Sequence, residues 1–304
     1  MFNQKISVVS YLNAKPFIYG LMHAPNGSHF NFCLDIPAVC AAKLATNEVQ
    51  VGLIPVAAML DMQNPQIITD YCISAHEAVN SVFIFANNSI DEIHTIYLDP
   101  HSRSSNNLAK ILLKYFWKKE VEFKERTIDI VSLKDGEAFV LIGDRTFGIQ
   151  VQYQHVYDLA TAWFNFTELP FVFAAWVANT VLTADFIKEF NEVLAYGLAN
   201  KNEVIKANQL ANFDVADYLN NTYECKKKGR GYEAIPSEVP KNKYEDDSNY
   251  KYIPNELFEF RTCLQKDSKW FDMESSTHLP GSGKHLFPMQ KRCGFDNSDS
   301  TISQ

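Results

Sequence analysis

The sequence predicts an α/β protein with two lobes around a ligand cleft. Short apolar runs of strand length alternate with segments of helical periodicity from the start of the chain to about residue 224. This alternation is typical of parallel or mixed sheets that carry helices on both faces. A length of 304 residues allows two domains of ordinary size, and a composition of 46% apolar and 21% charged residues supports a sizeable core.

The first unit reaches about residue 90. An apolar run over 6–9 predicts a buried strand, and the segment that follows predicts a helix over 17–22. Asp35 can cap the next helix, over 36–45, and Pro37 lies just inside its start, where a missing N–H costs nothing. Further strands are predicted over 31–35, 49–53, 66–70 and 80–86, with a helix over 56–61.

The second unit begins after two asparagines at 87–88. Strands are predicted over 93–98, 121–123, 138–142 and 171–179, and helices over 104–118, 157–166, 184–200 and 202–209. The chain is expected to cross between the units near residues 90 and 175. We therefore expect one lobe from residues 1–90 plus about 176–224 and a second from 91–175, which is the architecture of type II periplasmic binding proteins.

Charge and composition argue against several classes of function. The formal net charge is −8 and no basic block lies beside an aromatic platform, so nucleic-acid binding is not expected. The longest apolar stretch, 169–178, has about half of the roughly 20 residues that a spanning helix needs. The start of the chain resembles no secretory signal, and the six scattered cysteines include no C-x-x-C pair. We expect a cytoplasmic protein with reduced thiols, and no zinc site.

The composition changes at residue 225. Residues 1–224 carry 15 basic and 24 acidic residues, whereas the remainder carries 13 and 12. Stretches such as 236–250 and 281–304 bury too little apolar surface to offset the entropy lost on ordering, so disorder is expected there. A second explanation stays open: the run at 226–229 implies an A-rich coding tract that invites frame slips. The tail 225–304 would then be a frameshift product.

Two single residues are candidates for contact with a ligand. Asn13 follows the first predicted strand, and in open α/β sheets ligand-contacting groups lie at the carboxyl ends of strands. Ser81 is a small hydroxyl residue that leads an apolar strand. Each also has a structural interpretation, because Asn is common in turns and a serine can simply begin a strand.

Two turns are further candidates. Ser104 and Ser105 follow Arg103 at a helix start, where free backbone N–H groups and the helix dipole favour a carboxylate or phosphate. Gly143 permits close approach of the backbone after a strand, and Asp144 can cap the next segment or contact a ligand. The alternatives are an ordinary serine cap with a surface arginine, and a plain turn.

Five segments together resemble the chorismate dehydratases of the futalosine route to menaquinone. They occur in the order and spacing of that family over about residues 4–224: 10–17 (SYLNAKPF), 51–56, 98–105, 142–144 and 169–176. The sister family, 1,4-dihydroxy-6-naphthoate synthase, shares the fold but characteristically opens with a Ser-Pro-Cys-Pro-Asn-Asp type of motif. This chain lacks that opening.

The resemblance implies a lyase that removes water from chorismate, a small-molecule substrate, with no metal or organic cofactor. It ties Asn13 and Ser81 to the chemistry. It further implies that Arg103, Ser104, Ser105, Gly143 and Asp144 hold carboxylates from the facing lobe. Two other functions remain open: a noncatalytic small-anion binding protein of the same fold, and the sister synthase.

Overall fold

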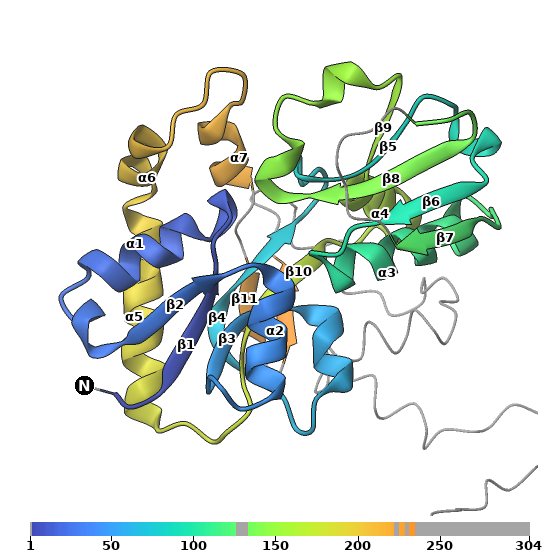
Figure 1. Cartoon of the computed structure of the whole chain (residues 1–304). Helices are drawn as coiled ribbons and strands as arrows, with labels where there is room; N and C mark the ends of the chain where they lie inside the picture. The colour runs from blue at the N-terminus through green and yellow to red at the C-terminus, as the bar shows by residue number, and fades with distance from the viewer. Residues whose placement is uncertain (1, 126–132, 222–224, 229–230, 235–304) are drawn as a thin grey trace, which may run out of the picture. The chain divides into compact units, whose positions relative to one another are not determined.

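The computed structural model describes residues 2–125 and 133–221, together with the backbone of residues 225–228 and 231–234 (Figure 1). Two five-stranded sheets organise it. The first has the order β2 (Asn31–Asp35), β1 (Lys5–Val9), β3 (Val51–Pro55), β10 (Phe171–Ala178), β4 (Gln66–Ala75). The second has the order β7 (Glu122–Glu125), β6 (Thr95–Leu98), β8 (Glu137–Ile142), β5 (Val82–Ala86), β9 (His155–Asp158).

Both sheets are mixed. In the first, β1 is parallel to β2 and β3, whereas β10 is antiparallel to β3 and β4. In the second, β6 is parallel to β7 and β8, and β5 is antiparallel to β8 and β9. The α/β class expected from the sequence is therefore confirmed.

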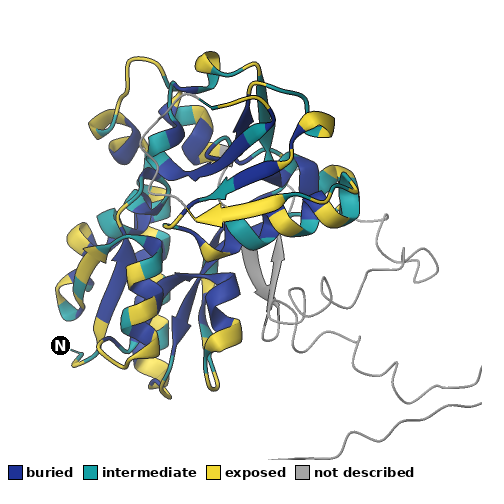
Figure 2. Ribbon diagram, turned by 45° about the vertical axis from the view of Figure 1, so that its right-hand side comes forward, coloured by how far each residue is buried: buried dark blue, intermediate teal, exposed yellow. Residues whose placement is uncertain are grey.

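Helices cover the sheets and leave the central strands buried, whereas the edge strands β2 and β7 are largely exposed. In the first lobe, α2 (Pro37–Ala45) packs on β1 and β3, and α5 (Ala184–Ala199) packs on α1 (Lys15–His23) and β4. In the second, α3 (Arg103–Ile111) and α4 (Leu159–Thr167) pack on β8 and β5 respectively. Figure 2 shows the buried strands in dark blue, with exposed residues on the outer faces of helices and on the edge strand β7. Among the described residues, no helix has the length and apolar character to cross a membrane.

Helices α1 and α5 approach each other through glycines. A Cβ on Gly197 would lie 1.9 Å from the carbonyl oxygen of Pro16, and one on Gly20 would lie 2.1 Å from that of Val193. No side chain other than hydrogen fits at either position. The two glycines therefore set the distance of α1, and of the turn before it, from the rest of the lobe.

The strands divide between the sheets differently from the expected lobes. Strand β5, which the expected boundary near residue 90 leaves in the first lobe, is hydrogen-bonded in the second sheet. Strand β10, which the expected second lobe of 91–175 mostly contains, lies in the first sheet. The chain therefore changes sheet between β4 and β5 and again between β9 and β10.

A short part of the tail is described: the backbones of β11 (Cys225–Lys228) and β12 (Gly231–Ala234) pair antiparallel. The stretches 236–250 and 281–304, for which disorder was expected, lie outside the described residues. Most of the tail lies outside the described residues, and its frameshift origin stays a prediction. All cysteines were expected to be reduced; Cys33 and Cys40 are free, whereas Cys72 is disulfide-bonded.

Candidate functional site

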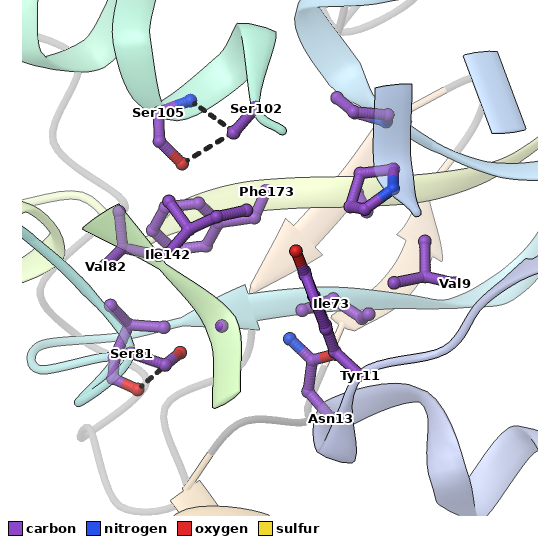
Figure 3. A pocket seen from close by; sticks show the side chains of 15 residues that line it. Val9, Tyr11, Asn13, Ile73, Ser81, Val82, Ser102, Ser105, Ile142 and Phe173 are labelled. Atoms are coloured by element: carbon purple, nitrogen blue, oxygen red, sulfur yellow. Dashed lines mark hydrogen bonds between the residues drawn. The ribbon is translucent and has the colours of Figure 1, made fainter. Parts of the chain in front are cut away.

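A cavity of about 50 Å³ lies between the two lobes, and Figure 3 shows the side chains that line it. Both lobes supply its wall, which is mostly apolar with a few hydroxyl and amide groups. The lining residues are Val9, Tyr11, Asn13, Pro37, Pro55, Ile73, Val79, Ser81, Val82, Ser102, Ser105, Ile142, Gly143, Phe173 and Ala174.

Asn13 presents an amide to this cavity from the first lobe. It lies in the 3₁₀ turn η1 (Leu12–Ala14), between the end of β1 and α1, whose second residue is Pro16. The side-chain oxygen of Asn13 is buried and has no hydrogen-bond partner among the described residues. Because an unpaired buried acceptor is costly, this oxygen is a candidate for contact with a bound ligand.

Ser81 faces Asn13 from the start of β5, and a buried tyrosine from α7 (Val215–Asn221) joins them. The hydroxyl of Tyr218 donates a 2.9 Å hydrogen bond to the Ser81 Oγ, and the side chain of Asn13 lies close enough to lower the pKa of this tyrosine. The Ser81 hydroxyl has one longer contact, 3.4 Å to the carbonyl oxygen of Val79. Burial raises the pKa of Tyr218, so it stays protonated.

Tyr11 crosses from the first lobe to the second. Its hydroxyl is 2.9 Å from Nδ1 of His101. Burial raises the pKa of Tyr11, although the nearby Arg145 acts in the opposite direction. The Arg145 guanidinium donates a 2.5 Å hydrogen bond to the fully buried Asp99. Burial, with a smaller effect of Arg145, lowers the pKa of His101, which favours the neutral imidazole.

Gly143 and Asp144 hold the lobes together at the cavity edge. Gly143 has a φ of +68°, and a Cβ there would lie 2.8 Å from the ring of Tyr11. The Asp144 carboxylate accepts the backbone N–H of Leu12 at 2.9 and 3.1 Å. Burial raises the pKa of Asp144, although the Leu12 N–H and the Lys15 charge act in the opposite direction.

The serines at the start of α3 have two different surroundings. Ser102 and Ser105 line the cavity, whereas Ser104 contacts the first lobe. Ser102 is the N-cap: its Oγ accepts the Ser105 N–H at 3.1 Å, and its hydroxyl donates to the Ser105 Oγ at 2.9 Å. Both line the cavity. Ser104 instead accepts the backbone N–H of Ala57 from the first lobe, and Arg103 pairs with Asp61 at 2.6 Å in an exposed position.

The structure thus brings four predicted site residues to one cavity: Asn13, Ser81, Ser105 and Gly143. Arg103, Ser104 and Asp144 are not part of the lining, and their contact with a substrate stays a prediction. Sequence reasoning missed two residues of the site. Tyr11 belongs to the segment 10–17 that carries the family resemblance, and Tyr218 bonds Ser81, which is 137 residues away in the chain. No local sequence signal indicates such a long-range bond.

The lining residues that the structure describes include no carboxylate, imidazole, ammonium or guanidinium group. The cavity can hold an apolar ring and direct hydroxyl and amide groups at its polar substituents. It offers no side chain suited to remove a proton from carbon at neutral pH. Among the described residues, no group of three or more His, Cys, Asp or Glu side chains is placed to hold a metal ion.

Comparisons with known proteins point in one direction. A family model described as menaquinone biosynthesis matches residues 4–236, which extends beyond the resemblance expected over 4–224. A chorismate dehydratase of Thermus thermophilus is 25% identical over 223 residues, which cover 64% of this chain and 82% of the relative.

Solved structures share the fold at low identity. A protein of Archaeoglobus fulgidus has a TM-score of 0.55 at 15% identity, covering 72% of this chain and 87% of its own. A Candida albicans protein described as having the generic periplasmic binding protein fold has a TM-score of 0.51 at 16% identity, covering 74% and 82%. The alkanesulfonate-binding protein of Xanthomonas axonopodis pv. citri has a TM-score of 0.51 at 9% identity, covering 72% and 83%. The expected periplasmic-binding-protein-like fold is confirmed.

Proposed function

Because this chain belongs to the menaquinone biosynthesis family, we propose that it is a hydro-lyase that converts chorismate to 3-[(1-carboxyvinyl)oxy]benzoate. The observation that carries the proposal is the pairing of Asn13 and Ser81 in a cavity whose lining has no general base. Chorismate supplies two carboxylates of its own, so a site that positions it without a base suits this reaction.

The proposed reaction is a substrate-assisted elimination. The enolpyruvyl carboxylate takes the proton from the ring carbon that bears the ether oxygen, and the electron pair of that C–H bond stays on the ring. The bond between the adjacent ring carbon and its hydroxyl group then breaks, and hydroxide leaves. The electron pair forms the last double bond of the aromatic ring, and the ether bond is kept. One water is lost in total, and no oxidant or reductant is needed.

The protein contributes position and fixed dipoles in this account. Ser81 donates to the enolpyruvyl carboxylate and holds it near the ring proton, and the oxygen of Asn13 accepts the O–H that forms when the proton is transferred. Such positioning supplies a large part of a barrier reduction. The Ser105 Oγ accepts from Ser102, so its own proton is available to the second carboxylate. Fixed dipoles of this kind stabilise the charge that develops on the ring and carboxylate.

Replacing Asn13 or Ser81 tests the proposal. We expect Asn13→Ala and Ser81→Ala each to lower kcat/KM for chorismate by about 100-fold or more, the range found for single groups that stabilise developing charge. Asn31→Ala and Ser28→Ala, which change exposed residues of the same types, are the matched controls and should keep wild-type turnover. Near wild-type turnover in both Asn13→Ala and Ser81→Ala would contradict the assignment.

A noncatalytic carboxylate-binding protein is the second candidate, favoured by the absence of carboxylate and imidazole side chains, the usual general bases, from the described lining. Calorimetry of chorismate binding separates the two. Binding without formation of the aromatic product by the wild-type protein would favour this second function.

A further inference from the structure

The ring of Tyr218 lies in an aromatic setting outside the cavity lining. Its ring packs edge-on against Phe147 and Phe213, with centroids 5.4 and 5.3 Å away. The side chain is buried, yet its hydroxyl reaches the two residues that we place in the chemistry, Asn13 and Ser81. Aromatic packing accounts for the position of the ring, but it does not account for the hydroxyl, which bonds Ser81.

Counting donors and acceptors fixes how the three groups are arranged. A phenol has a single proton, and Tyr218 donates it to the Ser81 Oγ. Its oxygen can then only accept, and Asn13 lowers the pKa of Tyr218, as an amide N–H directed at the phenol oxygen does. The amide oxygen of Asn13 consequently points away from Tyr218, and it is the atom left buried without a partner among the described residues.

The same count limits where the Ser81 hydroxyl can donate its proton. Since the Ser81 Oγ already accepts from Tyr218, its own proton must go elsewhere. Within the described part of the chain, its one acceptor is the Val79 carbonyl at 3.4 Å, a long contact that a ligand oxygen can replace. The cavity therefore presents one acceptor, from Asn13, and one donor, from Ser81.

We propose that Tyr218 is a positioning residue that holds the Asn13 amide with its oxygen toward the cavity and leaves the Ser81 hydroxyl free to donate to a ligand. The inference rests on the proposed function and deepens it. In that reaction the enolpyruvyl carboxylate must act as a base. Tyr218 determines whether this carboxylate meets the oxygen or the NH₂ group of Asn13.

The orientation of the amide matters for proton transfer. An acceptor oxygen beside a carboxyl group favours its protonated form, because only that form has an O–H to donate. The carboxylate is thereby a stronger base toward the ring proton, which moves from carbon to the carboxylate oxygen. A rotated amide would present NH₂ instead, which favours the carboxylate and weakens it as a base.

The variant Tyr218→Phe removes the hydroxyl and keeps the aromatic packing. We expect kcat to fall roughly 10- to 100-fold, the range seen when a group that supports a ligand-contacting residue is removed. KM should stay unchanged or fall, because the rotated amide binds the carboxylate at least as well. Tyr196→Phe, on the outer face of α5, is the matched control and should leave both constants unchanged.

A double-variant comparison separates positioning from a purely structural effect. If Tyr218 acts mainly through Asn13, adding Tyr218→Phe to Asn13→Ala should lower kcat by less than about threefold further, since interacting residues are not additive. An equally large loss in both backgrounds, a wild-type kcat in Tyr218→Phe, or an effect confined to KM would overturn the inference.

The side-chain amide signals of Asn13 give a readout that does not depend on activity. These signals are identified by their loss in Asn13→Ala in nuclear magnetic resonance spectra of the labelled full chain. In Tyr218→Phe they should shift and exchange faster with solvent, and unmoved signals would overturn the inference. If the wild-type protein does not convert chorismate, the proposed function fails, and these signals still decide whether Tyr218 orients the amide.

Discussion

Gly143 shows how a single residue shapes the cavity. Its φ of +68° is strained for any L side chain, and an added Cβ would lie 2.8 Å from the Tyr11 ring. We expect Gly143→Ala to lower the free energy of unfolding by about 1–2 kcal/mol through the backbone alone. Because Tyr11 must also move, chorismate turnover should fall at least tenfold. Urea unfolding and a turnover assay measure the two effects.

Gly148→Ala is the matched control for that variant. Gly148 has a φ of +77°, but the nearest atom to an added Cβ is the Cβ of Asn212, at 3.9 Å. It should therefore show the same loss of stability from the backbone and keep wild-type turnover. If both variants lost turnover equally, the contact between Gly143 and Tyr11 would not matter for function.

Asp144 makes stability depend on pH. Its pKa in the folded state is raised above the usual 3.8 by burial. Its contribution to the free energy of unfolding is therefore fully present below about pH 3.8 and is lost as the pH rises through the folded-state pKa. We expect the stability of the wild-type protein relative to Asp144→Asn to decrease as the pH rises above about 3.8, measured by urea unfolding. An increase would mean that the Leu12 N–H stabilises the carboxylate more than burial destabilises it.

Some site residues were predictable from the sequence and others were not. Asn13 lies in the segment 10–17 after a predicted strand, and Ser81 leads an apolar strand and was tied to the chemistry by the family resemblance; the structure places both in the cavity lining. Tyr218 could not be assigned, because a buried tyrosine gives no local indication of its partner. Arg103 was expected to bind an anion from its position at a helix start, but in the structure it pairs with Asp61. Local sequence cannot show which opposite charge the fold brings near.

At the scale of elements, the crossing of α1 and α5 positions the turn that carries Asn13. Gly197 contacts the Pro16 carbonyl so closely that a Cβ would lie 1.9 Å away, and backbone atoms cannot yield as a flexible side chain does. Alanine is favoured over glycine within a helix by about 1 kcal/mol, so propensity alone predicts that Gly197→Ala stabilises the protein. We expect the opposite, a loss of at least about 2 kcal/mol with reduced chorismate turnover. Thermal and urea unfolding provide the test, and a stabilised variant would contradict the packing described.

The elements themselves were largely predictable, with instructive differences. Apolar periodicity gave α2, α5 and the central strands of both sheets within a few residues. The helix expected over 104–118 ends its α-helical part at Ile111 and continues as a π-helical turn, Leu112–Phe116. The helix expected over 157–166 is preceded by a strand, β9, because Asp158 caps α4 there. Periodicity detects an amphipathic segment but not the hydrogen-bond register within it.

At the scale of the molecule, several contacts join the two lobes around the cavity. They are the bonds of Asp144 to Leu12, Tyr11 to His101, and Ser104 to Ala57, with the Arg103–Asp61 ion pair at the surface. A cavity of about 50 Å³ is far smaller than the several hundred Å³ of typical ligand sites, so we expect these contacts to open when a substrate enters.

The ion pair offers a prediction about this opening. Exposed ion pairs contribute about 0–1 kcal/mol, so Arg103→Ala should change stability little and KM for chorismate by less than about threefold. Asp61→Asn, which breaks the same pair from the other lobe, should behave alike. A large increase in KM for Arg103→Ala alone, seen in steady-state kinetics, would mean that the guanidinium leaves Asp61 and binds the substrate.

The most direct test of the account is incubation of the purified full chain with chorismate, followed by mass spectrometry and ultraviolet absorbance. The account predicts an aromatic product that has lost one water and retained the enolpyruvyl ether, formed by the wild-type protein and at least about 100-fold more slowly by Asn13→Ala. Recovery of unchanged chorismate from a folded protein that binds it would contradict the central claim.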